Sequence, residues 1–256
     1  MNSITVFLMN YNGGKEAVKA AVNAVMNQTI KHDTIFLDND STDGSFGFAS
    51  GYSLKNNLGI RFIRNGKNRH VCYLQQQAMD MCKTKYAAFC HIDCVPEKAW
   101  LRKLYRVAEK ENAGAVEPRI VHDGGVTIHG GITRWFTPTL VPEGRYPSSV
   151  STCTTLYRNL GLKMFPASYL HYHDETYASE VIKRAGYKLV HMDGCIVNHG
   201  HGSAAGLTGL KWKALARFNQ MRLVLKFHRP CPNPPECFNP ASLCPCRYEE
   251  LRKNEL

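Results

Sequence analysis

Short apolar runs alternate with amphipathic helical stretches along the first half of this chain. Residues 4–9 form an apolar run typical of a strand buried on both faces, and residues 15–28 repeat apolar side chains at helical spacing. Alternating strands and helices build a mainly parallel sheet covered by helices, with ligands beyond the carboxyl ends of the strands. Further strands are expected at 34–37, 60–63, 86–92, 114–116, 188–191 and 195–197, and further helices near 71–82, 98–111 and 174–185.

Length and hydrophobicity indicate one main domain with an extension. The 256 residues, 44% of them hydrophobic, can bury one large core. We expect a main domain at 1–209, with a nucleotide-binding half at 1–118 and an acceptor half at 119–209. Residues 210–256 add a basic helix at 210–227 and a Cys-rich tail. The chain has neither an apolar stretch of roughly 18 to 20 residues nor a secretory pattern, so a cytoplasmic protein is expected.

The balance of charge favours anionic partners. Lys and Arg number 32 against 21 Asp and Glu, which gives a formal net charge of +11. A positive surface attracts phosphates, nucleic acid or anionic lipid, so peripheral contact with an anionic membrane is one option. A nucleotide-binding cleft is another.

Three polar side chains follow the expected strands at their carboxyl ends. Asp38 comes directly after a buried run, where a carboxylate can accept a hydrogen bond from a base or a ribose, although it could also cap a turn. His91 and Asp93 lie two residues apart at another strand end, so their side chains point to one side. Together they could share a divalent cation, or they could be structural.

Two later segments also carry groups suited to chemistry. His199 stands in a Gly-rich loop after an expected strand, where it is either a ligand or an exposed loop residue. Asp174 and Glu175 begin a helix, whose dipole stabilises acidic groups in its first turn. Ordinary helix capping explains the acidic pair equally well.

In their order and spacing, these segments resemble family 2 glycosyltransferases of the GT-A fold, over roughly residues 3 to 225. Residues 10–14 (Asn-Tyr-Asn-Gly-Gly) are similar to the family's Thr-Tyr-Asn opening, and residues 27–29 to its Asn-Gln-Thr. Residues 38–45 (Asp-Asn-Asp-Ser-Thr-Asp-Gly-Ser) match its Asp-Asn-x-Ser-Thr-Asp-Gly-Ser. The resemblance implies an α/β, Rossmann-like, mostly parallel sheet flanked by helices, followed here by the C-terminal helix and Cys-rich tail.

The same resemblance implies a donor site. Tyr11 and Asp38 would hold the nucleotide base, and Asn12 and Asp43 would line the donor pocket. We also assign Asn10, Asn68 and His91 to donor binding.

A divalent metal, Mn²⁺ or Mg²⁺, is implied as well. Asp93 takes the second acidic position of the family's Asp-x-Asp, His91 replaces the first, and His199 matches the histidine that coordinates the metal. Imidazole remains a competent ligand for manganese-like ions.

The implied reaction is a direct displacement with inversion, in which one carboxylate takes the acceptor's proton while the metal holds the leaving diphosphate. Glu175 takes the place of the usual catalytic base, and Asp174 is the second choice because the order of the acidic pair is swapped. The donor is expected to be a UDP-sugar, and the acceptor a glycan or a hydroxylated base in DNA. The alternative is an inactive module that binds a nucleotide-sugar or nucleic acid.

Aromatic and cysteine residues complete the candidate sites. Trp135 could stack on a sugar or pack in the core. The tail offers four thiols within sixteen residues, enough for one structural Zn²⁺, with free thiols or disulfides as alternatives. These are Cys231, Cys237, Cys244 and Cys246. The other six cysteines are expected to be reduced thiols that pack as small hydrophobic residues. They are Cys72, Cys82, Cys90, Cys94, Cys153 and Cys195.

Overall fold

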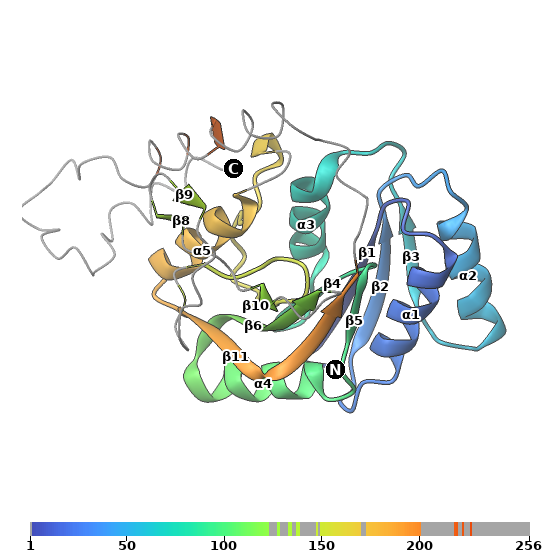
Figure 1. The fold of residues 1–256 in the computed structure, drawn as a ribbon, viewed down its shortest axis with the longest axis horizontal. Coiled ribbons are helices and arrows are strands. Elements are labelled where there is room, and N and C mark those ends of the chain that lie inside the picture. Colours follow the sequence, from blue (N-terminus) through green and yellow to red (C-terminus); the bar gives the residue numbers. More distant parts are fainter. Residues whose placement is uncertain are drawn as a thin grey trace, which may run out of the picture.

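A curled, mostly parallel β-sheet flanked by helices forms the body of the molecule (Figure 1). The computed structural model describes residues 2–122, 127–128, 133–134, 137–138, 147, 149–169, 173–200, 218–219, 222 and 226. The main sheet has nine strands in the order β3-β2-β1-β4-β10-β6-β11-β5, with β7 paired to β6. The predicted α/β class is therefore confirmed.

The strands of this sheet are β1 (Ile4–Asn10), β2 (Asp33–Asp38), β3 (Arg61–Arg64), β4 (Tyr86–His91), β5 (Cys94–Pro96), β6 (Ala113–His122), β7 (Thr127–Ile128), β10 (Leu156–Arg158) and β11 (Lys188–His199). A separate two-stranded sheet pairs β8 (Thr133–Arg134) with β9 (Thr137–Pro138). The helices are α1 (Lys15–Met26), α2 (Ser45–Lys55), α3 (His70–Met81), α4 (Trp100–Glu111) and α5 (Asp174–Arg184), with a 3₁₀ turn at Ala167–Tyr169.

Two layers of helices bury the two faces of the sheet. Ile4, Val6 and Leu8 of β1 pack in a core cluster with residues of α1, α2 and α4. Phe7 and Met9 point the other way, into a second cluster with residues of α3 and α5. Successive side chains of a strand point to opposite faces, so a strand covered on both sides is mostly apolar. The run at 4–9 has this pattern, and its one polar side chain, Thr5, is buried and shares a hydrogen bond of 2.9 Å with the Thr84 hydroxyl.

Strand directions bring many carboxyl ends to one edge of the sheet. Strand β1 runs parallel to β2 and β4, and β2 runs parallel to β3. Strand β10 is antiparallel to both β4 and β6, so β6 points the same way as β4, and β11 is parallel to β6. Asn10, Asp38, His91 and His199, the last residues of their strands, therefore lie at this edge.

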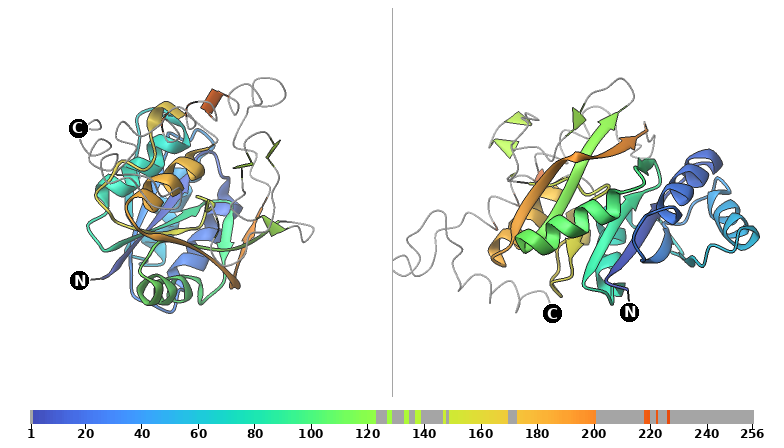
Figure 2. Two further views of the ribbon diagram at one scale, coloured as in Figure 1. Left: turned by 90° about the vertical axis from the view of Figure 1, so that its left-hand side faces the viewer. Right: turned by 90° about the horizontal axis from the view of Figure 1, so that it is seen from below.

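The far end of the sheet curls back towards its centre. Strand β5 begins three residues after β4 ends, yet it pairs antiparallel with the carboxyl end of β11, where His199 lies opposite Cys94. Figure 1 and the right-hand view in Figure 2 show β11 sweeping across the sheet to reach β5. A register shift between Met192 and Ile196 marks a bulge in β11, and bulges bend strands.

Several elements differ from the sequence-based expectation, and the short strands β5, β7, β8 and β9 were not predicted. Helix α2 was not predicted, because Gly47 and Gly51 lower helix propensity and mask the period. Strand β10, only three residues long, was not predicted either, and β11 is one continuous strand instead of two. The expected domain division at residue 118 falls inside β6, so the division stays a prediction. Of the expected helix at 210–227, the described residues 218, 219, 222 and 226 are helical.

Within the described part of the chain, the helices are too short or too polar to cross a lipid bilayer.

Two glycines provide a matched test of the packing. A Cβ atom on Gly114 would lie 2.4 Å from Ile182 Cγ2 and 2.7 Å from Tyr187 Cβ, whereas one on Gly47 would meet nothing within 4 Å. We expect Gly114→Ala to lower the free energy of unfolding by about 1–3 kcal/mol through overpacking. Gly47→Ala should raise it by roughly 0.5–1 kcal/mol, because Ala is the better helix former. Urea denaturation measures both, and equal effects would contradict the close approach of β6 and α5.

Candidate active site

A buried asparagine joins the loops that follow β1 and β2. The Nδ2 group of Asn10 shares its two hydrogens among Asp38 Oδ1 at 2.7 Å, Ser45 Oγ at 2.9 Å and Ser41 Oγ at 3.0 Å. Its Oδ1 accepts a bond from the backbone N–H of Gly13 at 3.3 Å. Asn10 is completely buried, so its side chain organises this edge from beneath.

Asp38 is also completely buried, and its carboxylate is held from several sides. It accepts hydrogen bonds from the backbone N–H of Ser41 at 2.9 Å and from the Ser41 hydroxyl at 2.6 Å. Arg64 Nε lies 3.5 Å from Asp38 Oδ2. These contacts give Asp38 a role in shaping the loop, and its contact with a nucleotide base stays a prediction.

Asn12 and Asp43 face solvent and connect the loops after β1 and β2 on their exposed side. Thr42 N–H donates to Asn12 Oδ1 at 2.8 Å, and Gly14 N–H donates to Asp43 Oδ2 at 2.8 Å. Burial alone would raise the pKa of Asp43, but hydrogen bonds from Ser45 and Gly14 hold it below its ordinary value. Both residues are exposed, and their role in lining a donor pocket stays a prediction.

Asn68 belongs to the loop that leads into α3. Its Oδ1 accepts bonds from Asn39 Nδ2 and from the backbone N–H of His70, both at 2.9 Å. This ties the α3 loop to the end of β2, and Asn68 itself is exposed. Tyr11 is partly exposed in the neighbouring loop. All the predicted donor residues except His91 are thus gathered on the loops after β1, β2 and β3.

Asp93 and His199 meet, although they lie far apart in the sequence. His199 Nε2 is 3.6 Å from Asp93 Oδ1, and these side chains are 22% and 24% exposed. Gly200 N–H also donates to the backbone carbonyl of Asp93 at 2.8 Å. Oxygen and nitrogen ligands bind divalent ions at roughly 2.0–2.2 Å, so two donor atoms at this separation fit one ion between them.

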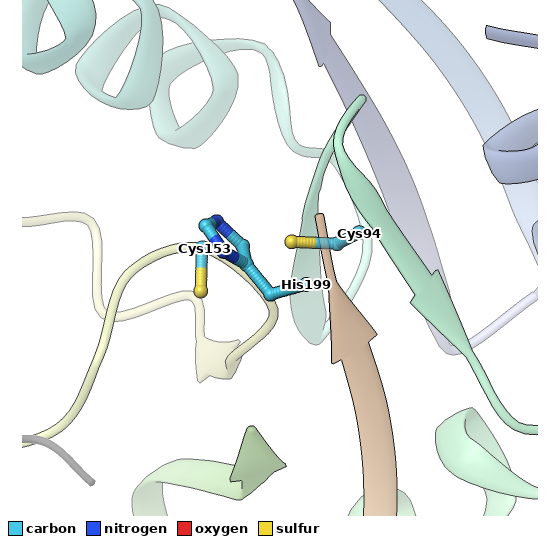
Figure 3. A group of neighbouring side chains, drawn as sticks. All are labelled: Cys94, Cys153 and His199. Carbon is cyan, nitrogen blue, oxygen red and sulfur yellow. The ribbon is translucent and has the colours of Figure 1, made fainter. Parts of the chain in front are cut away.

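Two cysteines lie beside this pair. Cys94, Cys153 and His199 offer ligand atoms that all lie within 4.8 Å of one another (Figure 3). A hydrogen bond from Cys94 lowers the pKa of the Cys153 thiol, whereas burial raises the pKa of Cys94. His91 is not a member of this group; its backbone N–H donates to the Cys153 carbonyl at 2.9 Å. Its roles in metal and donor binding stay predictions.

The acidic pair stands at the first turn of α5. Asp174 is buried and accepts a hydrogen bond from Thr152 Oγ1 at 3.2 Å. Desolvation by the surrounding protein raises the pKa of Glu175 well above its ordinary value, and the negative charge of Asp174 raises it further. Glu175 as a residue remains partly exposed. A carboxyl group with a raised pKa is a stronger base when ionised, as general-base catalysis requires.

One loop, before β10, lies between the acidic pair and His199. Thr152 donates its hydroxyl hydrogen to Asp174 at 3.2 Å, and the Sγ of the next residue, Cys153, lies within 4.8 Å of a ring nitrogen of His199. The buried carboxylate of Glu117 holds this loop by accepting the N–H of Ser151 at 2.7 Å. No sequence motif marks residues 151–153, and our sequence reasoning missed their role.

The family assignment agrees with this geometry. A family model described as glycosyl transferase family 2 matches residues 5–166, more than half of the chain. The chain belongs to this family. None of the curated proteins matches this family 2 glycosyltransferase significantly.

Solved structures share the fold of this chain at low sequence identity. A Staphylococcus aureus TarS fragment in complex with UDP superposes with a TM-score of 0.63 and 11% identity, covering 87% of this chain and 65% of that chain. GalNAc-T7 with UDP, GalNAc and Mn²⁺ has a TM-score of 0.70 and 14% identity, covering 98% and 54%. The predicted GT-A-type fold is confirmed.

A third similar structure is the Pyrobaculum calidifontis mannosyltransferase PcManGT in complex with GDP-Man and Mn²⁺. Its TM-score is 0.66 at 13% identity, and the match covers 94% of this chain and 68% of that chain. The chain therefore spans only about half to two thirds of the length of these three structures.

Some predicted site residues lie outside the described part of the chain. They are Trp135 and the tail cysteines Cys231, Cys237, Cys244 and Cys246. The other six cysteines are free thiols, and all except Cys153 are buried.

Asn10 offers a test of the polar network beneath the two loops. We expect Asn10→Ala to lower the free energy of unfolding by about 1–3 kcal/mol, because it leaves buried acceptors of Asp38 and the two serines without a donor. Asn12 has a left-handed backbone (φ 50°), which glycine adopts without strain, so Asn12→Gly removes one exposed acceptor and should change stability by less than about 1 kcal/mol. Chemical denaturation compares the two. Equal losses in the free energy of unfolding would show that the stability of this network does not depend on its burial.

Proposed function

We propose that this transferase moves a sugar from a nucleotide-diphosphate sugar, first of all a UDP-sugar, to a hydroxyl acceptor with inversion at the anomeric carbon. The observation that carries the proposal is the approach of Asp93 and His199 to 3.6 Å at the carboxyl edge of the sheet. This edge is where open α/β sheets bind their ligands.

We propose Asp93 and His199 as ligands of a divalent cation, Mn²⁺ or Mg²⁺, with His91 close to it. When bound, such an ion would neutralise the charge that develops on the leaving diphosphate. Mn²⁺ in the GalNAc-T7 and mannosyltransferase structures supports this choice of metal. Asp93 and His199 are each about a quarter exposed, so solvent ions can reach them.

The donor would lie over the loops after β1, β2 and β3. Asn12 and Asp43 project there from loops whose shape the buried Asn10 and Asp38 determine. Tyr11 and Asn68 border the same region and complete the proposed donor set. UDP in the TarS and GalNAc-T7 structures supports a uridine donor, whereas GDP-Man in the mannosyltransferase keeps a guanosine donor as the second option.

Glu175 is the proposed base, and Asp174 the second choice. Glu175 would take the proton of the acceptor hydroxyl while that oxygen attacks the anomeric carbon and the bond to the diphosphate breaks. Since the acceptor attacks directly, one base suffices. Asp174 would raise the basicity of Glu175 through its negative charge. The hydrogen bond from Thr152 would hold Asp174 in place.

The acceptor is proposed only as a hydroxyl group, with a glycan as the first class to test. The comparisons give no support to a hydroxylated base in DNA. Trp135 remains the proposed stacking platform for the acceptor. The rival proposal is an inactive binding module, which the swapped acidic pair and the replaced first acid of Asp-x-Asp motivate.

Metal dependence is the first test. A thermal-shift screen of nucleotide-sugars should find a donor that raises the melting temperature only when Mn²⁺ is present, because binding to the native state stabilises it. Asp93→Asn and His199→Ala should abolish the metal-dependent part. Asp80→Asn, on the exposed face of α3, serves as the control and should keep it. If the shift in melting temperature is the same with and without Mn²⁺ in every variant, the assignment of Asp93 and His199 as metal ligands is wrong.

Turnover separates an enzyme from an inactive module. Glu175→Gln should reduce donor hydrolysis by roughly 10²–10⁴-fold while donor binding stays, because only the proton transfer is lost. Glu16→Gln, in the first turn of α1, is a matched control that should keep full turnover. If Asp174→Asn abolishes turnover and Glu175→Gln does not, the roles of the two acids are reversed. The absence of hydrolysis with every stabilising donor would favour the inactive module.

The raised pKa of Glu175 predicts a pH profile. The base must be ionised, so turnover should fall as pH drops through the raised pKa. Asp174→Asn removes the neighbouring charge and should move this acidic limb to lower pH. Turnover rates measured across pH at saturating donor give the pH at which activity falls. If this pH is the same in Asp174→Asn, the charge of Asp174 does not raise the pKa of Glu175. Ionised Glu175 also destabilises the folded state above its unfolded pKa, so Glu175→Gln should raise the melting temperature at neutral pH.

A further inference from the structure

Two thiols and an imidazole converge next to the proposed donor metal. Cys94 begins β5, Cys153 lies in the loop before β10, and His199 ends β11. Their ligand atoms all lie within 4.8 Å of one another, and Figure 3 shows the three side chains gathered from these separate elements. In a tetrahedral Zn²⁺ site, bonds of about 2.0–2.3 Å place neighbouring ligand atoms roughly 3.3–3.8 Å apart. A contraction of about one ångström would therefore close the cluster around an ion.

The backbone holds all three ligands in place. Cys94 and His199 are direct partners in the antiparallel pairing of β5 with β11. The Cys153 carbonyl accepts the N–H of His91, which fixes its loop against the end of β4. Residues in regular pairing keep their relative positions, so the cluster belongs to the fold.

Asp93 adds negative charge at the border of the cluster. Its Oδ1 lies 3.6 Å from His199 Nε2 and 3.6 Å from Cys94 Sγ. A carboxylate beside a histidine ligand either joins the ion or orients the ring for it, and both increase affinity.

We propose that Cys94, Cys153 and His199 form a binding site for a thiophilic divalent cation, Zn²⁺ first of all, which excludes Mn²⁺ from the donor site. Thiolates prefer Zn²⁺ to Mn²⁺ or Mg²⁺, whose ligands are mainly oxygen. Zn²⁺ binding displaces the proton of each thiol into solvent. A neutral imidazole has a single nitrogen lone pair, so His199 binds one ion at a time. The exclusion rests on the proposed function, but Zn²⁺ binding itself does not.

Cobalt spectroscopy tests binding without any need for turnover. The full chain is used with Cys231, Cys237, Cys244 and Cys246 all changed to Ser, so that tail thiols make no contribution. Added Co²⁺ should produce one equivalent of thiolate-to-cobalt charge-transfer absorption, which added Zn²⁺ should remove. Cys153→Ser and Cys94→Ser should each lose most of the absorption. Cys195→Ser, which changes another buried free thiol on β11, should keep it.

Absorption that is missing in the tail variant, or unchanged in Cys153→Ser, would overturn the site. Cys94 is completely buried, so its variant is interpreted only if its thermal melt stays cooperative. Cys153 is partly exposed and provides the result if the Cys94 variant does not fold.

Zinc inhibition tests the competition. In Mn²⁺-dependent donor hydrolysis, each rate is expressed relative to the same variant without Zn²⁺. Half-inhibition of Cys153→Ser should need at least roughly ten- to a hundredfold more Zn²⁺ than the parent, as expected when a ligand is lost. Unchanged inhibition would refute the competition. A chain with cobalt absorption but without hydrolysis would refute the proposed function and leave the metal site standing.

Discussion

The pairing of β5 with the end of β11 is the contact on which the candidate site depends. It places His199 opposite Cys94 and within 3.6 Å of Asp93, although β4 and β11 are separated by two other strands in the sheet. Side chains alternate along a strand, so a slip of one residue would turn His199 to the other face. The bulge in β11 before Ile196 bends the strand, so that its carboxyl end can reach β5.

Beneath the donor loops, burial of polar groups provides rigidity. Asn10 and Asp38 are completely excluded from water, yet each has several hydrogen-bond partners within the loops. A buried polar group that loses its partner is costly, so the network restricts the loops to one arrangement. The exposed Asn12 and Asp43 are then positioned before any ligand arrives, which reduces the entropy lost on binding.

One loop lies between the acidic pair and the proposed metal ligand His199. Thr152 donates a hydrogen bond to Asp174, Cys153 Sγ lies within 4.8 Å of a ring nitrogen of His199, and Glu117 accepts the N–H of Ser151. Burial and the neighbouring Asp174 disfavour the ionised form of Glu175, which weakens folding at neutral pH but yields a stronger base. The folded protein is thus less stable with Glu175 ionised, which is the form that the proposed reaction requires.

Local sequence patterns were enough to predict most of the parallel strands and the kinds of side chain at the edge of the sheet. Apolar runs predicted β1, β2 and β4, and polar residues at their ends predicted a ligand site, because period and residue type are local properties. Helix α2 was not predicted, because Gly47 and Gly51 obscure its helical period. Cys94 and Cys153 were assigned to packing. Their approach to His199 emerges only in the folded chain, because the pairing of strands that are distant in sequence depends on the whole topology and has no local sequence signature.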